Sequence, residues 1–182
     1  MNALVQDKAQ GGLATAQAVA EQKQYLTFML GGEMFAIGIL AIKEIIEYAG
    51  LTEVPMMPKC IPGVINLRGA VVPVMDLTAR FGKPASAVTK RSCIVIVEIA
   101  AEGESERHDI GVVVDAVNAV LEIAPSEIEP APAFGAKIRT DFILGMGKVN
   151  GKFVILLNVN RVLSIEEIGE LAQAAEAAQQ LQ

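Results

Sequence analysis

Residues 62–77 read Pro62-Gly-Val-Ile-Asn-Leu-Arg-Gly-Ala-Val-Val-Pro-Val-Met-Asp-Leu77, which is two apolar runs separated by Arg68-Gly69. Glycine adopts positive φ without steric cost, so two β-branched runs around this pair predict a β-hairpin. Pro73 has no N–H to donate to a ladder, and we therefore expect its strand to have an open side there. Asp76 is a good N-cap, which predicts a short helical segment directly after the hairpin.

This hairpin has a counterpart later in the chain. Asn150-Gly151 is the strongest kind of short hairpin signal. The structural glycines Gly63 and Gly69 match Gly145 and Gly151, each 82 positions further along the chain. The same offset relates Val72 to Val154, Val74 to Leu156, Asp76 to Asn158 and Phe81 to Leu163, and a separate match relates Ile37-Gly38-Ile39 to Ile110-Gly111-Val112. We interpret the chain as two β units of similar plan.

The remaining apolar runs are short and bounded by turn residues, which predicts a mainly β protein. Because barrels close the edges of short strands, we expect two small five-stranded β-barrel subdomains around a shared hydrophobic core, with short helices. Their approximate bounds are 24–90 and 91–163, and exchange of terminal segments between them is left open. Residues 1–23 are expected to form a mobile tail, and a capping box at Ser164 predicts a C-terminal helix or tail over 164–182. The strands are expected at 24–30, 34–39, 43–48, 64–67, 71–75, 92–99, 109–114, 119–123, 142–149 and 152–157.

Composition excludes several classes of function. The chain has 182 residues and a net charge of −6, with no cluster of Lys or Arg, so nucleic acid is a poor partner. Nothing approaches the roughly 18 consecutive apolar residues of a membrane span. The N-terminal residues contain no apolar block of the signal-peptide type. These observations predict a cytoplasmic protein without direct membrane insertion.

The sequence offers no support for an enzyme, a metal site or a cofactor. His108 is the only histidine and has no other metal ligand near it in sequence. Gly145-Met-Gly147-Lys148 lacks the spacing of a phosphate-binding loop. Cys60 and Cys93 are isolated, which favours two reduced thiols.

A binding surface has more support. Asn66 and Arg68 lie two positions apart and share one face of a strand. Arg68 is either a solvated turn residue, a local partner of Glu44 or Glu47, or a binding residue. Ile39 and Ile42 are likewise either core residues or part of an interface. An apolar patch beside an Arg and a Glu has the composition of an interface centre.

The stretch Gly63 to Leu77 resembles the signature of the CheW family of bacterial chemotaxis coupling proteins. Three further stretches agree with that family, namely Tyr25 to Ile46, Ile110-Gly-Val-Val-Val-Asp-Ala-Val117 and Gly145 to Leu163. The resemblance covers about residues 22–163 and implies two five-stranded barrels around a shared core. The regulatory domain of the kinase CheA has the same family fold.

The resemblance implies a non-catalytic adaptor that links the helical cytoplasmic tips of methyl-accepting chemoreceptors to CheA, in receptor arrays that also bring copies of the adaptor together. The family's receptor-facing surface corresponds here to Leu26, Ile39, Ile42, Glu44, Asn66 and Arg68. The resemblance also implies that a barrel of the adaptor contacts the homologous barrel of the kinase. It assigns no residues to that contact. The alternatives are a coupling protein of a pilus or gliding chemosensory system and, in a different class, a small-molecule-binding β-barrel.

Overall fold

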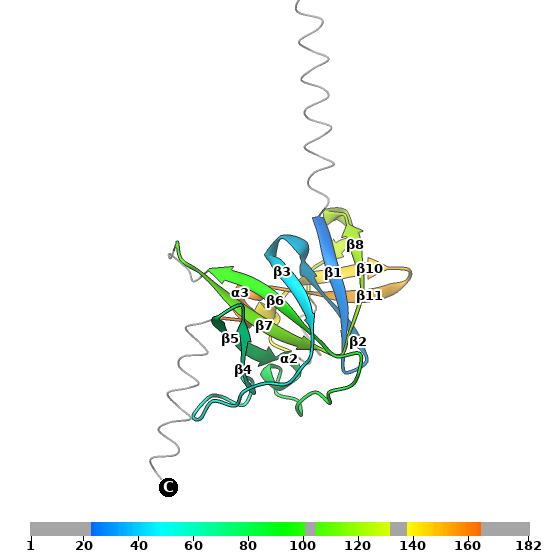
Figure 1. The fold of residues 1–182 in the computed structure, drawn as a ribbon. Coiled ribbons are helices and arrows are strands. Elements are labelled where there is room, and N and C mark those ends of the chain that lie inside the picture. The colour runs from blue at the N-terminus through cyan, green and yellow to red at the C-terminus, as the bar shows by residue number, and fades with distance from the viewer. Residues whose placement is uncertain (1–22, 101–104, 132–137, 165–182) are drawn as a thin grey trace, which may run out of the picture.

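The computed structural model describes residues 23–100, 105–131 and 138–164, which form two β sheets and a few short helical segments (Figure 1). The predicted tail at 1–22 and the predicted C-terminal helix beyond Ser164 lie outside these residues. The strands are β1 (Lys23–Leu30), β2 (Glu33–Gly38), β3 (Ile42–Glu47), β4 (Gly63–Leu67), β5 (Ala70–Asp76), β6 (Cys93–Ala100), β7 (Arg107–Val114), β8 (Ala116–Ile123), β9 (Ile128–Glu129), β10 (Ile143–Val149) and β11 (Lys152–Leu157). The short helical segments are η1 (Ile39–Ala41), α2 (Leu77–Arg80), η2 (Pro125–Glu127), η3 (Thr140–Phe142) and α3 (Val159–Val162).

The predicted mainly β class is confirmed. One sheet has six strands in the order β8-β1-β2-β11-β10-β9, and the other has five in the order β3-β6-β7-β5-β4. The sixth strand of the larger sheet is β9, a two-residue strand that the sequence did not predict. Strands β7 and β8 also begin earlier than expected, at Arg107 and Ala116.

The sheets do not divide the chain near residue 90. Strands β1 and β2 leave the first half of the chain to join β8–β11, whereas β6 and β7 leave the second half to join β3–β5. Each sheet therefore contains strands from both halves of the chain. Two parallel contacts complete the sheets, between β2 and β11 and between β5 and β7.

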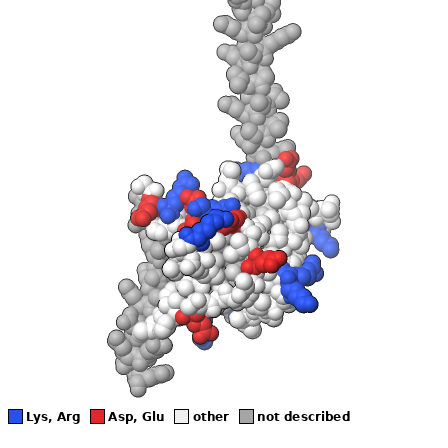
Figure 2. Space-filling view, viewed as in Figure 1, with Lys and Arg blue, Asp and Glu red and all other residues white. Residues whose placement is uncertain are grey.

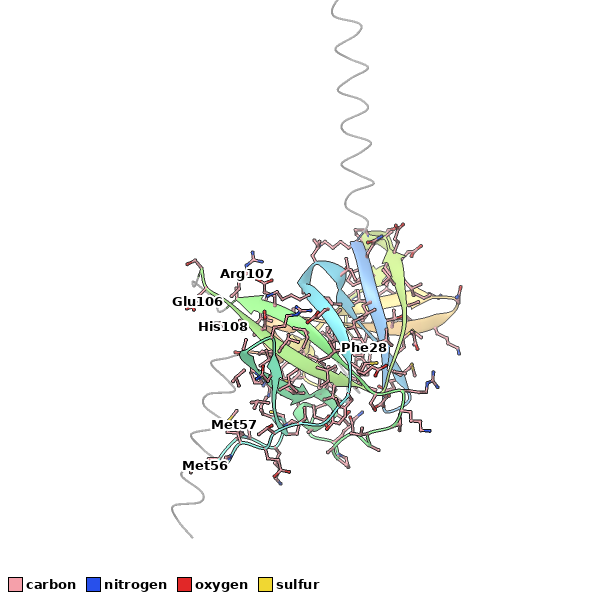
Figure 3. All side chains as sticks on the ribbon, viewed as in Figure 1. Phe28, Met56, Met57, Glu106, Arg107 and His108 are labelled. Atoms are coloured by element: carbon pink, nitrogen blue, oxygen red, sulfur yellow. The ribbon has the colours of Figure 1, made fainter. Side chains whose placement is uncertain are left out.

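The apolar residues form a shared core and two smaller clusters. The shared core takes Phe28 and Phe35 from the six-stranded sheet and Val95 and Val112 from the five-stranded sheet. Figure 3 places Phe28 near the centre of the molecule. One further cluster belongs to the six-stranded sheet and includes Tyr25, Ala36, Ile123, Val154 and Leu156, while the other belongs to the five-stranded sheet and includes Val72, Val74, Ile94, Ile96 and Val113.

The internal repeat is present in the structure. The unit β4-β5-α2 recurs as β10-β11-α3, and the bounds of α2 and α3 differ by the same 82 positions. The parallel pairings show how β7 corresponds to β2. Val74 of β5 lies opposite Gly111 of β7, and its counterpart Leu156 of β11 lies opposite Ala36 of β2. Gly111 therefore corresponds to Ala36 and not to Gly38, so that part of the sequence match is shifted by two residues.

Both hairpins turn in the same way. Arg68 and Gly69 have φ values of 54° and 87°, and Asn150 and Gly151 have 51° and 77°. Positive φ at both central residues is the mark of a type I′ turn, whose twist matches that of the strands. Both predicted hairpins are confirmed.

The glycine that begins each repeat has a different role, because it allows a close approach of the backbone. A Cβ on Gly63 would lie 2.5 Å from the carbonyl oxygen of Thr52, and one on Gly145 would lie 2.9 Å from that of Glu129. Thr52 pairs with Val64 and Glu129 pairs with Met146, so each glycine lets a connecting segment cover the edge of its sheet.

Asp76 caps α2 as predicted. Its Oδ1 accepts hydrogen bonds from the N–H of Thr78 at 3.0 Å and of Ala79 at 3.3 Å. Its Oδ2 accepts another from the N–H of Ser86 at 2.9 Å, which ties the following connection to the helix. The side chain of Asn158, the corresponding residue, makes no cap hydrogen bond to α3.

Candidate interaction surfaces

The segment η1 and the start of β3 present an apolar surface. Ile39 and Ile42 are half-buried and pack against the shared core. Leu40 between them is 97% exposed. In a 3₁₀ turn three successive residues face three directions, so one of them must face outward when its neighbours pack inward. Leu40 was not among the predicted surface residues, because the apolar run at residues 39–42 does not indicate which of its side chains faces outward.

Leu26 does not belong to this surface. Its side chain is 2% exposed and lies in the shared core, so its predicted place on the receptor-facing surface is wrong. Strand β1 is an inner strand, paired with β2 on one side and β8 on the other. Side chains of such a strand that face the core are covered by the other sheet.

An ion pair joins the central hairpin to β3. Arg68 Nη2 donates to Glu44 Oε2 at 2.9 Å, with side-chain exposures of 79% and 26%. Local pairing with Glu44 was one of the alternatives that the sequence left open, and it is the one observed. β3 and β4 are opposite edges of the five-stranded sheet, so this contact shows that the sheet curls on itself. Within the described residues, the second oxygen of Glu44, Oε1, is buried and accepts no hydrogen bond.

Asn66 supports the turn that holds Arg68. Its Oδ1 accepts a hydrogen bond of 2.9 Å from the N–H of Gly69. Its side chain is exposed but already engaged, and this contact helps fix the direction in which Arg68 points.

Lys43 owes its position to a β-bulge. The register of β3 against β6 shifts between Ile42 and Glu44, which leaves Lys43 as the extra residue. Its Nζ lies 3.1 Å from Asp109 of β7. A further ion pair joins Arg107 to Glu98 at 3.7 Å. Figure 2 shows basic and acidic atoms side by side on the side of the molecule where β6 and β7 lie in Figure 1.

The two repeats expose apolar side chains at corresponding positions. Val71 in β5 and Phe153 in β11 are 82 positions apart and are 72% and 52% exposed. Ile45 and Val120 also correspond and are both exposed. Ile45 lies opposite Val95, and Val120 lies opposite Leu26, which is the residue equivalent to Val95 in the other sheet. Each sheet therefore exposes apolar side chains at the same two positions of the repeat.

A cleft of about 400 Å³ opens between β5 and β7. The sequence offered no candidate for a pocket. Pro73 lies on its wall, which confirms the open side predicted for that strand. The cleft is lined by Lys43, Ala70, Val71, Val72, Pro73, Glu98, Arg107, His108, Asp109 and Ile110. Figure 3 shows Arg107 and His108 at the outer end of β7.

The two residues with shifted pKa values are not among those that make up these surfaces. A hydrogen bond from Arg139 lowers the pKa of Asp141, and burial raises the pKa of Tyr25. Within the described residues no group of three His, Cys, Asp or Glu side chains is placed to hold a metal ion. Cys60 and Cys93 are free thiols, the first buried and the second half-buried. No helix in the described ranges is long and apolar enough to cross a membrane.

Comparison with known proteins agrees with this architecture. The model of the CheW-like domain matches residues 24–167. "Chemotaxis protein CheW" of Klebsiella aerogenes is 31% identical over 169 residues, which cover 91% of this chain and 98% of the relative. "Protein FrzA" of Myxococcus xanthus is 28% identical over 81% of this chain and 89% of the relative. The crystal structure of the scaffolding protein TtCheW from Thermoanaerobacter tengcongensis superposes with a TM-score of 0.70 at 34% identity, over 79% of this chain and 89% of that one.

The match covers both sheets, both hairpins and the short helices that follow them. The chain therefore belongs to the family of proteins with a CheW-like domain.

Proposed function

We propose that this chain is a non-catalytic adaptor in chemotaxis signalling, which couples methyl-accepting chemoreceptors to the histidine kinase CheA. Membership of the CheW-like family and the names of its relatives support this proposal. The adaptor acts in the cytoplasm, in arrays at the inner face of the membrane, without inserting into the bilayer.

The observation that carries the proposal is the joining of an apolar and a charged surface on η1 and β3. Leu40 is fully exposed beside the half-buried Ile39 and Ile42. Two residues after Ile42 in β3, Glu44 pairs with Arg68 of the turn between β4 and β5. An apolar ridge of a receptor helix fits against the first group, as in helix-in-groove recognition. The exposed Arg68 guanidinium then meets a receptor carboxylate.

The energy of this charged contact depends on its solvation. At an exposed rim such a pair contributes on the order of 1 kcal/mol. When it is desolvated and bidentate it contributes several times more. Exchange of partners by Arg68 between Glu44 and the receptor reduces the net gain, so we expect the apolar contact through Leu40 to supply most of the affinity.

The corresponding exposed residues of the two sheets suit an adaptor with more than one partner. Val71 and Phe153 give each sheet an exposed apolar side chain against which a partner can pack. One chain then contacts the kinase and a second protein of the array at the same time. Coupling follows when the adaptor binds one arrangement of kinase and receptor better than another, which shifts their populations.

The test is a pull-down of the purified chain with a CheA regulatory domain and a receptor cytoplasmic fragment. We expect Arg68→Glu to lose the receptor fragment while it keeps the kinase domain. Arg91→Glu is the matched control, because it makes the same charge change at another exposed arginine. Receptor binding by Arg68→Glu at the wild-type level would remove Arg68 from the site. Failure of the wild-type chain to bind either partner would overturn the proposed function.

A second candidate is a coupling protein of a pilus or gliding motility chemosensory system. The similarity to Protein FrzA over 81% of this chain favours keeping it. The two candidates share the fold and the surfaces described above and differ in the partner. Pull-downs with the kinase domains of both kinds of system separate them.

A further inference from the structure

The parallel ladder between β5 and β7 ends before the two strands end. Val74–Asp76 lie opposite Gly111–Val113, but the ladder does not extend to Val71 or Asp109. Both strands continue through this region, and each keeps its other neighbour, β4 or β6. The cleft of about 400 Å³ lies where the ladder stops.

Pro73 is the cause of this interruption. In the hairpin with its two-residue turn, Leu67 and Ala70 form the closing pair. Main-chain groups alternate along an antiparallel strand, so Val71, Pro73 and Met75 turn theirs away from β4 and toward β7. The next ladder bond therefore needs an N–H at position 73, and proline has none.

The second repeat serves as an internal control. Ile155 occupies the position of Pro73, and it does pair with its parallel neighbour, opposite Phe35 of β2. The same strand order with a non-proline residue thus carries the ladder one residue further. At this end, the ladder of the five-stranded sheet stops one residue earlier than that of the six-stranded sheet.

Beyond the end of the ladder, β5 and β7 still turn main-chain groups toward each other, and the ladder does not pair them. The N–H and C=O of Val71 face the cleft, and the alternation along β7 turns those of Asp109 and Arg107 toward it as well. The Val71 side chain is 72% exposed beside them. Unpaired strand edges of this kind are templates for another extended chain.

The charged side chains around the cleft do not favour the binding of a small ion. Lys43 pairs with Asp109 and Arg107 pairs with Glu98, so the basic and acidic groups on the wall balance. The β5–β7 ladder supplies no partner for the main-chain donors and acceptors that face the cleft. An extended peptide supplies both, and an apolar side chain on it contacts Val71. A helix does not, because its main-chain groups are already paired internally.

We propose that the cleft between β5 and β7 receives an extended segment of the kinase by strand addition. This rests on the proposed function, in which the kinase regulatory domain is the β-rich partner and the receptor tip is the helical one. Main-chain hydrogen bonds to Val71, Arg107 and Asp109 hold the segment.

The first test follows amide hydrogen exchange by NMR in the complete chain, with and without the kinase regulatory domain. Strand addition predicts that exchange at Val71, Arg107 and Asp109 slows by at least about tenfold with the kinase domain. The receptor fragment leaves these three amides unchanged. If it protects them instead, the occupant has been assigned wrongly.

The second test removes a single donor. Val71→Pro deletes the cleft-facing N–H without touching the pairing with β4, and Val71→Thr is the matched control that keeps the N–H. We expect the proline variant to bind the kinase domain at least about tenfold more weakly than the threonine variant. Pro73→Val supplies the missing N–H donor and should therefore close the cleft. We expect this variant also to bind the kinase domain more weakly.

The outcomes separate this proposal from the proposed function. Kinase binding by the wild-type chain, with no change in exchange at the three amides and equal affinity of both Val71 variants, overturns strand addition alone. Absence of any kinase binding by the wild-type chain overturns both.

Discussion

Arg80 Nε donates a hydrogen bond of 3.0 Å to the carbonyl of Val162, the residue that holds the same position in the second repeat. The guanidinium carbon of Arg80 also lies 4.7 Å from the ring centroid of Phe142. Phe142 in turn is 6.2 Å from the ring of Phe81, measured between centroids. The two short helices are therefore joined directly, at the point where the repeats meet.

Replacement of Arg80 should weaken this junction. Arg80→Met keeps an apolar stem against Phe142 but loses the hydrogen bond and the cation–π contact. We expect the free energy of unfolding to fall by about 1–2 kcal/mol, measured by urea denaturation. Arg91→Met, at an exposed arginine, is the control and should leave stability unchanged. Equal midpoints for the two variants would contradict a role for Arg80 in joining the repeats.

Added methyl groups at the first glycine of each repeat should be destabilising. In Gly63→Ala the new Cβ meets the Thr52 carbonyl, which belongs to backbone and cannot swing aside. We expect a loss of about 1–3 kcal/mol, and a similar loss for Gly145→Ala. Gly38→Ala is the control, because its φ is −55° and nothing lies within 4 Å of the added Cβ. Gly38→Ala should be neutral or slightly stabilising, and a loss there as large as at Gly63 would refute the steric argument.

The ion pair between Arg68 and Glu44 should contribute little to stability. Arg68 is mostly exposed, so a double-mutant cycle with Arg68→Ala and Glu44→Ala should give a coupling free energy of about 0.2–1 kcal/mol. Raising the salt concentration should reduce it further. A coupling of several kcal/mol would show that the pair holds the curled sheet together and is not primarily part of a binding surface.

Leu40 and Leu26 should respond in opposite ways to truncation. Leu40→Ala removes an exposed side chain, so we expect stability to stay within about 0.5 kcal/mol and receptor binding to fall. Leu26→Ala leaves a cavity in the shared core and should cost about 2–5 kcal/mol. Val88→Ala, at an exposed residue outside η1 and β3, is the control for Leu40. Unchanged receptor binding by Leu40→Ala would exclude Leu40 from the interface.

Local chemistry made much of this protein predictable from its sequence. The type of a hairpin turn depends on its two central residues, so Arg68-Gly69 and Asn150-Gly151 predicted both hairpins. Asp76 predicted the N-cap of α2. The repeat was visible because corresponding turns need the same glycines. The open side of β5 followed from the missing N–H of Pro73.

The prediction that Leu26 lies on the interaction surface failed because burial depends on neighbours in space. An apolar residue on a strand has the same sequence signature whether its face meets solvent or another sheet. Leu40 was missed for the related reason that a run of four apolar residues does not state which of them points outward.

The sequence by itself determined where the two hairpins turn, that the chain is mainly β and that it contains two related β units. Only the tertiary structure decided which strands share a sheet, because pairing between segments far apart in the chain leaves no local signal. It also decided that Arg68 meets Glu44 and that the gap beside Pro73 opens as a cleft. Those contacts depend on how the five-stranded sheet curls, which is set by packing over the whole molecule.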